Sequence, residues 1–114
     1  MGGAFARHLL AAGFKVVGYD VSPVAGKALS RLGGQTVRSC AEVAARTRIL
    51  ITSLPSPAAM EEAYFGKHGI AAGARPGTIV IEASTMTLEL KEGLRRRLAR
   101  RGVQLLDCPV SGTG

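Results

Sequence analysis

The sequence predicts an α/β fold in which helices pack on a doubly wound parallel sheet. The 114-residue chain alternates short apolar runs with stretches in which apolar residues recur every three or four positions. Such alternation is typical of β–α–β units, whose successive strands run parallel. The length suits one domain, residues 1–114, and 46% apolar with 20% charged residues is ordinary for a globular protein.

The first twenty residues predict a helix followed by a strand. Ala6, Leu9 and Leu10 fall on one helix face, and Gly13 is placed to end that helix. Residues 15–19 then form a short apolar run that predicts a buried strand. In a nucleotide-binding β–α–β unit, a strand and a glycine-rich loop precede such a helix. We therefore expect the chain to begin inside a unit whose first strand is missing.

Serine, proline and glycine mark the ends of the following elements. Ser22 and Pro23 predict a helix start, because serine suits the N-cap and proline suits the first helical position. Ser39 and Glu42 fit a capping box, which predicts a brief helix to about Arg46. The other predicted elements are strands at 35–37, 49–54, 79–81 and 103–106, helices from 57 and over 88–101, and an irregular connection through Gly66, Gly69 and Gly73.

Composition excludes several classes of protein. No apolar run approaches the length of a membrane span, so we expect no membrane association. Cys40 and Cys108 have neither the number nor the spacing of a disulfide framework or a metal site. We expect reduced thiols, no bound metal and a cytoplasmic setting.

The net charge of +7 reflects a cluster of arginines near the end of the chain. A solvated helix face is the favoured interpretation, since no aromatic residues interleave with the arginines as a single-stranded nucleic acid surface requires. A non-catalytic module that uses this face to bind nucleic acid or an acidic partner stays open as an alternative. The residues concerned are Arg95, Arg96, Arg97, Arg100 and Arg101.

Two residues near the start predict a dinucleotide site. Gly2 opens a helix whose free amides and positive dipole end suit an anion such as a phosphate. Asp20 ends the next strand eighteen residues later, close to the spacing of about 20 expected for an acid that binds a ribose. A carboxylate there accepts ribose hydroxyls and repels a 2′-phosphate, so we predict NAD over NADP. The plainer interpretations are a simple helix start and an exposed acid.

Two further segments follow strands and should lie at the same sheet edge. Leu54 and Pro55 form a rigid turn that could lie against a flat ring such as nicotinamide. Thr85 follows the next strand, with its hydroxyl at the corresponding position. Taken alone, each segment is better explained as a strand end with a helix cap, the latter by Thr85 or Thr87.

Together these segments resemble the β-hydroxyacid dehydrogenase family, which includes 3-hydroxyisobutyrate dehydrogenase, tartronate semialdehyde reductase and 6-phosphogluconate dehydrogenase. The resemblance covers essentially the whole chain. It rests on the initial glycine helix at 1–13, the turn at 51–55, the signature at 76–85 and, most specifically, the segment Asp-Cys-Pro-Val-Ser-Gly at 107–112.

The resemblance implies a Rossmann-like NAD(P)-binding domain and assigns a role to each motif. Cofactor-binding residues would lie in the first three of these segments and at the end of the strand that follows the first helix. Ser111 and Gly112 would hold the carboxylate end of the substrate, although Thr113 stands where the family usually has another glycine. The implied cofactor contacts are Gly2 at the pyrophosphate, Asp20 at the adenosine ribose, Leu54 and Pro55 on the nicotinamide side, and Thr85 near the nicotinamide ribose.

The family transfers a hydride between NAD(P) and a small β-hydroxy acid such as 3-hydroxyisobutyrate, with a lysine as general acid and base. In the family that lysine lies on a helix well after Ser111, and an all-helical domain follows. We therefore assign no catalytic residue, expect the chain alone to be inactive, and expect the full-length protein to be a homo-oligomer. An imine reductase of related fold stays open as another alternative. The lysines at unmatched positions are Lys15, Lys27, Lys67 and Lys91.

Overall fold

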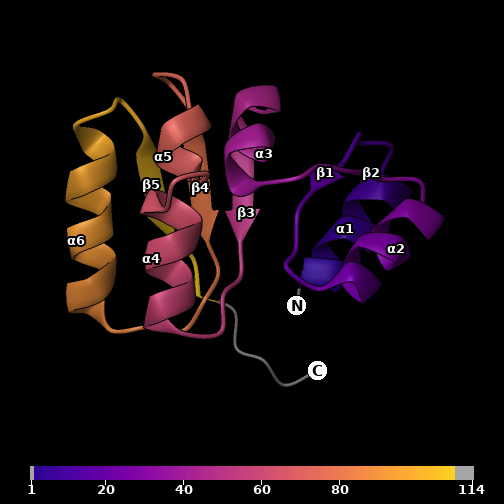
Figure 1. The fold of residues 1–114 in the computed structure, drawn as a ribbon, viewed down its shortest axis with the longest axis horizontal. Helices are drawn as coiled ribbons and strands as arrows, with labels where there is room; N and C mark the ends of the chain where they lie inside the picture. The colour runs from indigo at the N-terminus through magenta and orange to yellow at the C-terminus, as the bar shows by residue number, and fades with distance from the viewer. Residues whose placement is uncertain (1, 110–114) are drawn as a thin grey trace.

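The computed structural model of this chain describes residues 2–109 as helices alternating with short parallel strands (Figure 1). This arrangement confirms the predicted α/β class. The helices are α1 (Gly2–Ala11), α2 (Pro23–Arg31), α3 (Cys40–Arg46), α4 (Pro57–Phe65), α5 (Ile70–Gly73) and α6 (Leu88–Ala99). The strands are β1 (Val17–Gly18), β2 (Gln35–Thr36), β3 (Ile49–Thr52), β4 (Ile79–Glu82) and β5 (Gln104–Asp107).

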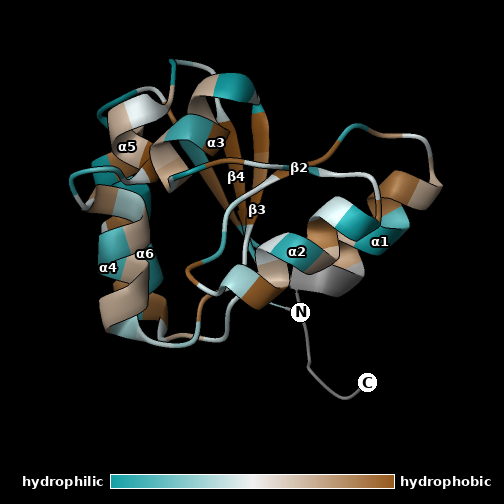
Figure 2. Cartoon of the chain, turned by 45° about the vertical axis from the view of Figure 1, so that its right-hand side comes forward, coloured by the Kyte–Doolittle hydropathy of each residue, from teal (hydrophilic) through white to brown (hydrophobic). Residues whose placement is uncertain are grey.

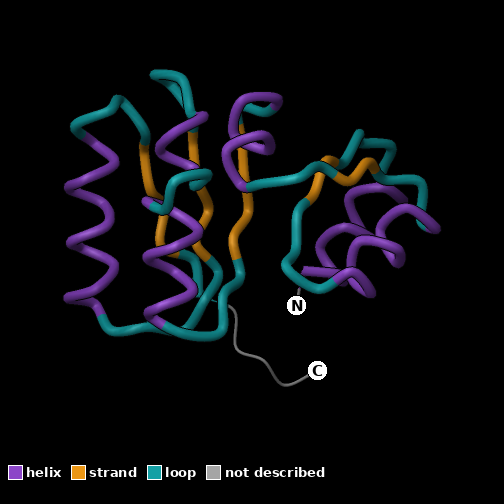
Figure 3. Tube along the Cα trace, in the orientation of Figure 1, coloured by secondary structure: helices purple, strands orange, loops and turns teal. Residues whose placement is uncertain are grey.

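The described strands form two parallel sheets, whereas the sequence predicts one. β1 pairs with β2, and the other sheet has the order β3-β4-β5, so that two groups of strands stand apart in Figure 3. Within residues 2–109, β1 hydrogen-bonds only to β2 and β3 only to β4. The chain passes from one sheet to the other through α3. The expected strand before Gly2 is outside the described residues and stays a prediction.

The core lies on one face of the three-stranded sheet. Leu50, Val80 and Leu105 are neighbours in register, are at most 6% exposed, and pack against side chains of α3 to α6. On the opposite face Ile49 and Ile51 remain 61% and 37% exposed. Both faces of this sheet carry apolar residues, so β3 and β4 have apolar colouring in Figure 2. The helices therefore cover one face of this sheet.

The first part of the chain has a thinner core. α1 and α2 lie beside the β1–β2 pair (Figure 1), and no side chain that the structure describes between Phe5 and Val43 is buried. Phe14 and Val24 are 62% and 77% exposed. Most of the stabilising apolar burial thus comes from the chain after α3 begins.

Caps form largely where the sequence predicts them. The Ser39 hydroxyl accepts the Glu42 amide at 3.1 Å, and the Thr87 hydroxyl accepts the Leu90 amide at 3.2 Å. Thr87 rather than Thr85 is therefore the cap of α6. Ser22 stands at the N-cap of α2 but makes no such side-chain bond. After α6, Gly102 adopts a φ of 74°, a backbone conformation that favours glycine.

Two local predictions are wrong. The connection predicted to be irregular contains the one-turn helix α5, because Ile70 and Ala71 are buried in the core and Gly73 approaches the Ala41 backbone too closely for a side chain. The strand predicted over 49–54 ends at Thr52, because the Leu54 amide donates its hydrogen bond to the Ser84 hydroxyl and not to a neighbouring strand. Within the described residues, every helix is too short or too polar to cross a membrane.

Candidate functional site

Polar residues end all three strands of the larger sheet. Thr52, Glu82 and Asp107 are the last residues of β3, β4 and β5, and the strand register places them side by side. Ligands of open parallel sheets bind beyond the carboxyl ends of the strands. This edge is therefore the candidate site.

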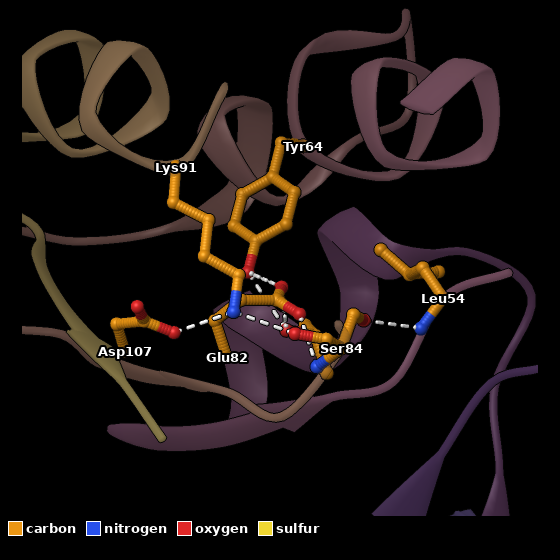
Figure 4. A network of polar contacts seen from close by, with 7 residues as sticks. Leu54, Tyr64, Glu82, Ser84, Lys91 and Asp107 are labelled. Carbon is orange, nitrogen blue, oxygen red and sulfur yellow. Dashed lines mark hydrogen bonds and ion pairs between the residues drawn. The ribbon is translucent and has the colours of Figure 1, made fainter. Parts of the chain in front are cut away.

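Glu82 is the centre of a buried polar network (Figure 4). Its side chain is fully buried, and one carboxylate oxygen accepts hydrogen bonds from the Tyr64 hydroxyl at 2.6 Å and the Thr52 hydroxyl at 2.5 Å. The other oxygen accepts the Ser84 amide at 2.7 Å. A buried carboxylate is tolerated only with such donors. Burial, reinforced by the Glu82 charge, raises the pKa of Tyr64 far above its usual value, so that the phenol remains a donor.

Lys91 reaches the same edge from α6. Its side chain is 5% exposed, and Nζ donates to the Ser84 carbonyl oxygen and to Oδ1 of Asp107, both at 2.5 Å. The Asp107 side chain is 35% exposed. One buried ammonium therefore joins the chain after β4 to the end of β5, as Figure 4 shows.

The predicted segments after β3 and β4 do come together. The Leu54 amide donates to the Ser84 hydroxyl at 2.6 Å. Leu54 also packs against the edge of the core, while Pro55 and Thr85 are exposed. The turn at Leu54 and Pro55 thus lies beside the segment that carries Thr85, as expected from their positions after neighbouring strands.

Gly2 and Asp20 belong to the other part of the fold. Gly2 begins α1, and Asp20 is an exposed residue that follows β1, where its Oδ1 accepts the Ser22 amide at 2.8 Å. Figure 1 shows the amino end of α1 and the loop after β1 on the same side of the molecule as the loop after β3. Asp20 is not part of the Glu82 network. Ser111 and Gly112 lie outside the described residues.

The arginine face makes several internal contacts. Arg95 pairs with Glu92 at 2.5 Å, and Arg97 pairs with Glu61 at 2.7 Å while its guanidinium lies 3.6 Å from the centre of the Phe65 ring. These contacts favour the interpretation of a solvated helix face.

Sequence reasoning missed Lys91 and the Glu82–Tyr64 pair. Neither Lys91 nor Tyr64 follows a predicted strand, and both lie within predicted helices. One signal was available: polar residues at the ends of three successive apolar strands must find partners if they are buried.

These features define a dinucleotide-binding α/β domain. Parallel strands end at one edge, and the free amides at the amino end of a helix suit a phosphate. All residues from 1 to 114 match the family model described as the NAD binding domain of 6-phosphogluconate dehydrogenase. The chain belongs to this family.

The relatives include dehydrogenases of hydroxy acids. The chain is 38% identical to L-threonate dehydrogenase of Cupriavidus necator and 35% identical to the mitochondrial 3-hydroxyisobutyrate dehydrogenase of Homo sapiens, over 98% of its own length in both cases. It spans 38% and 33% of those two proteins. Among solved structures, Psf3 in complex with NADP+ and 2-OPP is similar with a TM-score of 0.92 and 30% identity, covering 98% of this chain and 40% of that one.

Proposed function

We propose that this chain is the cofactor-binding part of an NAD-dependent dehydrogenase of small β-hydroxy acids, with 3-hydroxyisobutyrate as the type of substrate. The observation that carries the proposal is the hydrogen bond from the Leu54 amide to the Ser84 hydroxyl. It unites the segments after β3 and β4 at the edge where a parallel sheet binds its ligand. The dehydrogenases among the relatives support the same reaction class.

Each part of the cofactor would have its own contacts. The amino end of α1 at Gly2 would bind the pyrophosphate, and Asp20 would accept hydrogen bonds from the adenosine ribose. Leu54 and Pro55 would lie on the nicotinamide side, with Thr85 near the nicotinamide ribose. When bound, the nicotinamide supplies the hydride acceptor of the reaction. The Asp20 charge would disfavour the 2′-phosphate of NADP.

Substrate binding and proton transfer would involve other residues. Ser111 and Gly112 would hold the substrate carboxylate. None of the lysines in this chain is assigned as the acid and base, so we expect no turnover by the chain alone. An imine reductase would share the cofactor contacts and differ in the catalytic group. An activity assay of the full-length protein with a hydroxy acid and with an imine would therefore discriminate between the two.

Titration of the 114-residue chain with NADH and with NADPH, followed by nicotinamide fluorescence, tests the proposal. We expect weak binding with a preference for NADH. Asp20→Asn should reduce that preference, because the amide is a poorer acceptor for the ribose hydroxyls of NADH and no longer repels the 2′-phosphate of NADPH. Glu89→Gln, at an exposed acid in α6, is the control and should leave both affinities unchanged. If neither cofactor binds, the proposed function is wrong. If Asp20→Asn has no effect on the preference, the assignment of Asp20 to the adenosine ribose is wrong.

A further inference from the structure

We propose that Lys91 is a positioning residue that holds the chain after β4 and the end of β5 in the arrangement required by the nicotinamide half of the cofactor. This inference rests on the proposed function.

The contacts of Lys91 place it between two loops of the site. Nζ donates to the carbonyl oxygen of Ser84, which directly precedes Thr85, and Ser84 also holds the Leu54 amide through its hydroxyl. The second Nζ contact is Asp107, the last residue of β5. The next residue, Cys108, donates its amide to the Glu82 carbonyl oxygen at 2.9 Å. Lys91 thus fixes the point at which both segments leave the sheet.

The cost of burying a lysine argues against a purely stabilising role. Lys91 lies on the inner side of α6 with Leu94 and Leu98, which are 2% and 0% exposed. An apolar side chain would continue that pattern, and replacing a buried ion pair by apolar residues is often neutral or favourable for stability. What an apolar residue could not do is hold a carbonyl oxygen and a carboxylate at fixed positions. The geometry of the two loops is therefore the property that depends on the ammonium group.

The two halves of the cofactor would contact different parts of the fold. The segments that Lys91 joins follow β4 and β5, whereas Gly2 and Asp20 belong to α1 and to the loop after β1. ADP carries the adenosine and the two phosphates but lacks the second ribose, near which Thr85 would lie, and the nicotinamide ring. A displaced β4–β5 edge should therefore weaken NADH more than ADP, while general destabilisation of the fold should weaken both equally.

Calorimetric titration of the wild-type chain and Lys91→Met with NADH and with ADP tests the inference. Lys91→Met removes the ammonium and keeps a long side chain. We expect NADH binding to weaken on the order of tenfold, as expected for a lost charged hydrogen bond, with little change for ADP. Arg95→Met is the matched control, since Arg95 lies on the same helix and forms an exposed pair with Glu92. It should change neither affinity.

Asp107→Asn provides a second variant that keeps the shape of the side chain. It should weaken NADH selectively but by less than Lys91→Met, because the asparagine oxygen can still accept from Nζ. Equal losses for both ligands, or no loss in folded Lys91→Met, would overturn the inference. If Lys91→Met does not fold, an unchanged ratio of the two affinities in Asp107→Asn overturns it. If the wild-type chain binds neither ligand, the proposed function fails, and the inference that rests on it fails too.

Discussion

Tyr64→Phe removes one hydroxyl from the interior without opening a large cavity. Tyr64 is fully buried, and its hydroxyl donates to Glu82 at 2.6 Å. A hydrogen bond to a charged group contributes about 1.5–3 kcal/mol. Glu82 keeps the Thr52 hydroxyl and the Ser84 amide as donors in the variant, so the loss should lie near the middle of that range. We therefore expect the free energy of unfolding to fall by about 2 kcal/mol.

Urea unfolding of both proteins, followed by circular dichroism, measures this difference from the midpoint and slope. Tyr19→Phe is the matched control, because Tyr19 is 41% exposed, and it should change the free energy by less than about 0.5 kcal/mol. A Tyr64→Phe protein as stable as the wild type would refute the reasoning. It would mean that Glu82 gains nothing from its third donor, and that the network is not what accommodates a buried carboxylate.

Two further predictions concern stability. Because burial raises the pKa of Tyr64 in the folded state, the unfolded chain releases this proton first as the pH rises. Wild-type stability should therefore fall above a pH of about 10, and fall less steeply in Tyr64→Phe, as repeated urea titrations at several pH values would show. Ser39→Ala removes the cap bond to Glu42 and should cost about 1 kcal/mol in the same assay. Ser22→Ala, whose serine makes no cap bond, should cost less; equal losses would contradict the capping argument.

The sequence carries enough local information to place most elements. Ser39 and Thr87 cap helices because their hydroxyls satisfy free amides within the next three residues, and this chemistry can be read from the chain. The apolar run at 49–51, with its two β-branched isoleucines, likewise predicts a strand. The pairing of strands into sheets is a longer-range property. The two-residue strand β1 carries no pattern that specifies its neighbour, so the division into two sheets could not be predicted.

The candidate site shows the same limit at the level of single side chains. The segments of Leu54 and Thr85 could be placed at one sheet edge because each follows an apolar strand, and the bond between Leu54 and Ser84 shows that these segments lie together. Lys91 could not be assigned, because it is separated by sixteen residues from Asp107 and sits on the face of α6 where an apolar residue is expected. Only the folded chain shows that its ammonium group lies between a carbonyl oxygen and a carboxylate. A charged residue on an otherwise buried helix face is therefore a reason to search for partners at the nearest strand end, since burial without partners would be too costly.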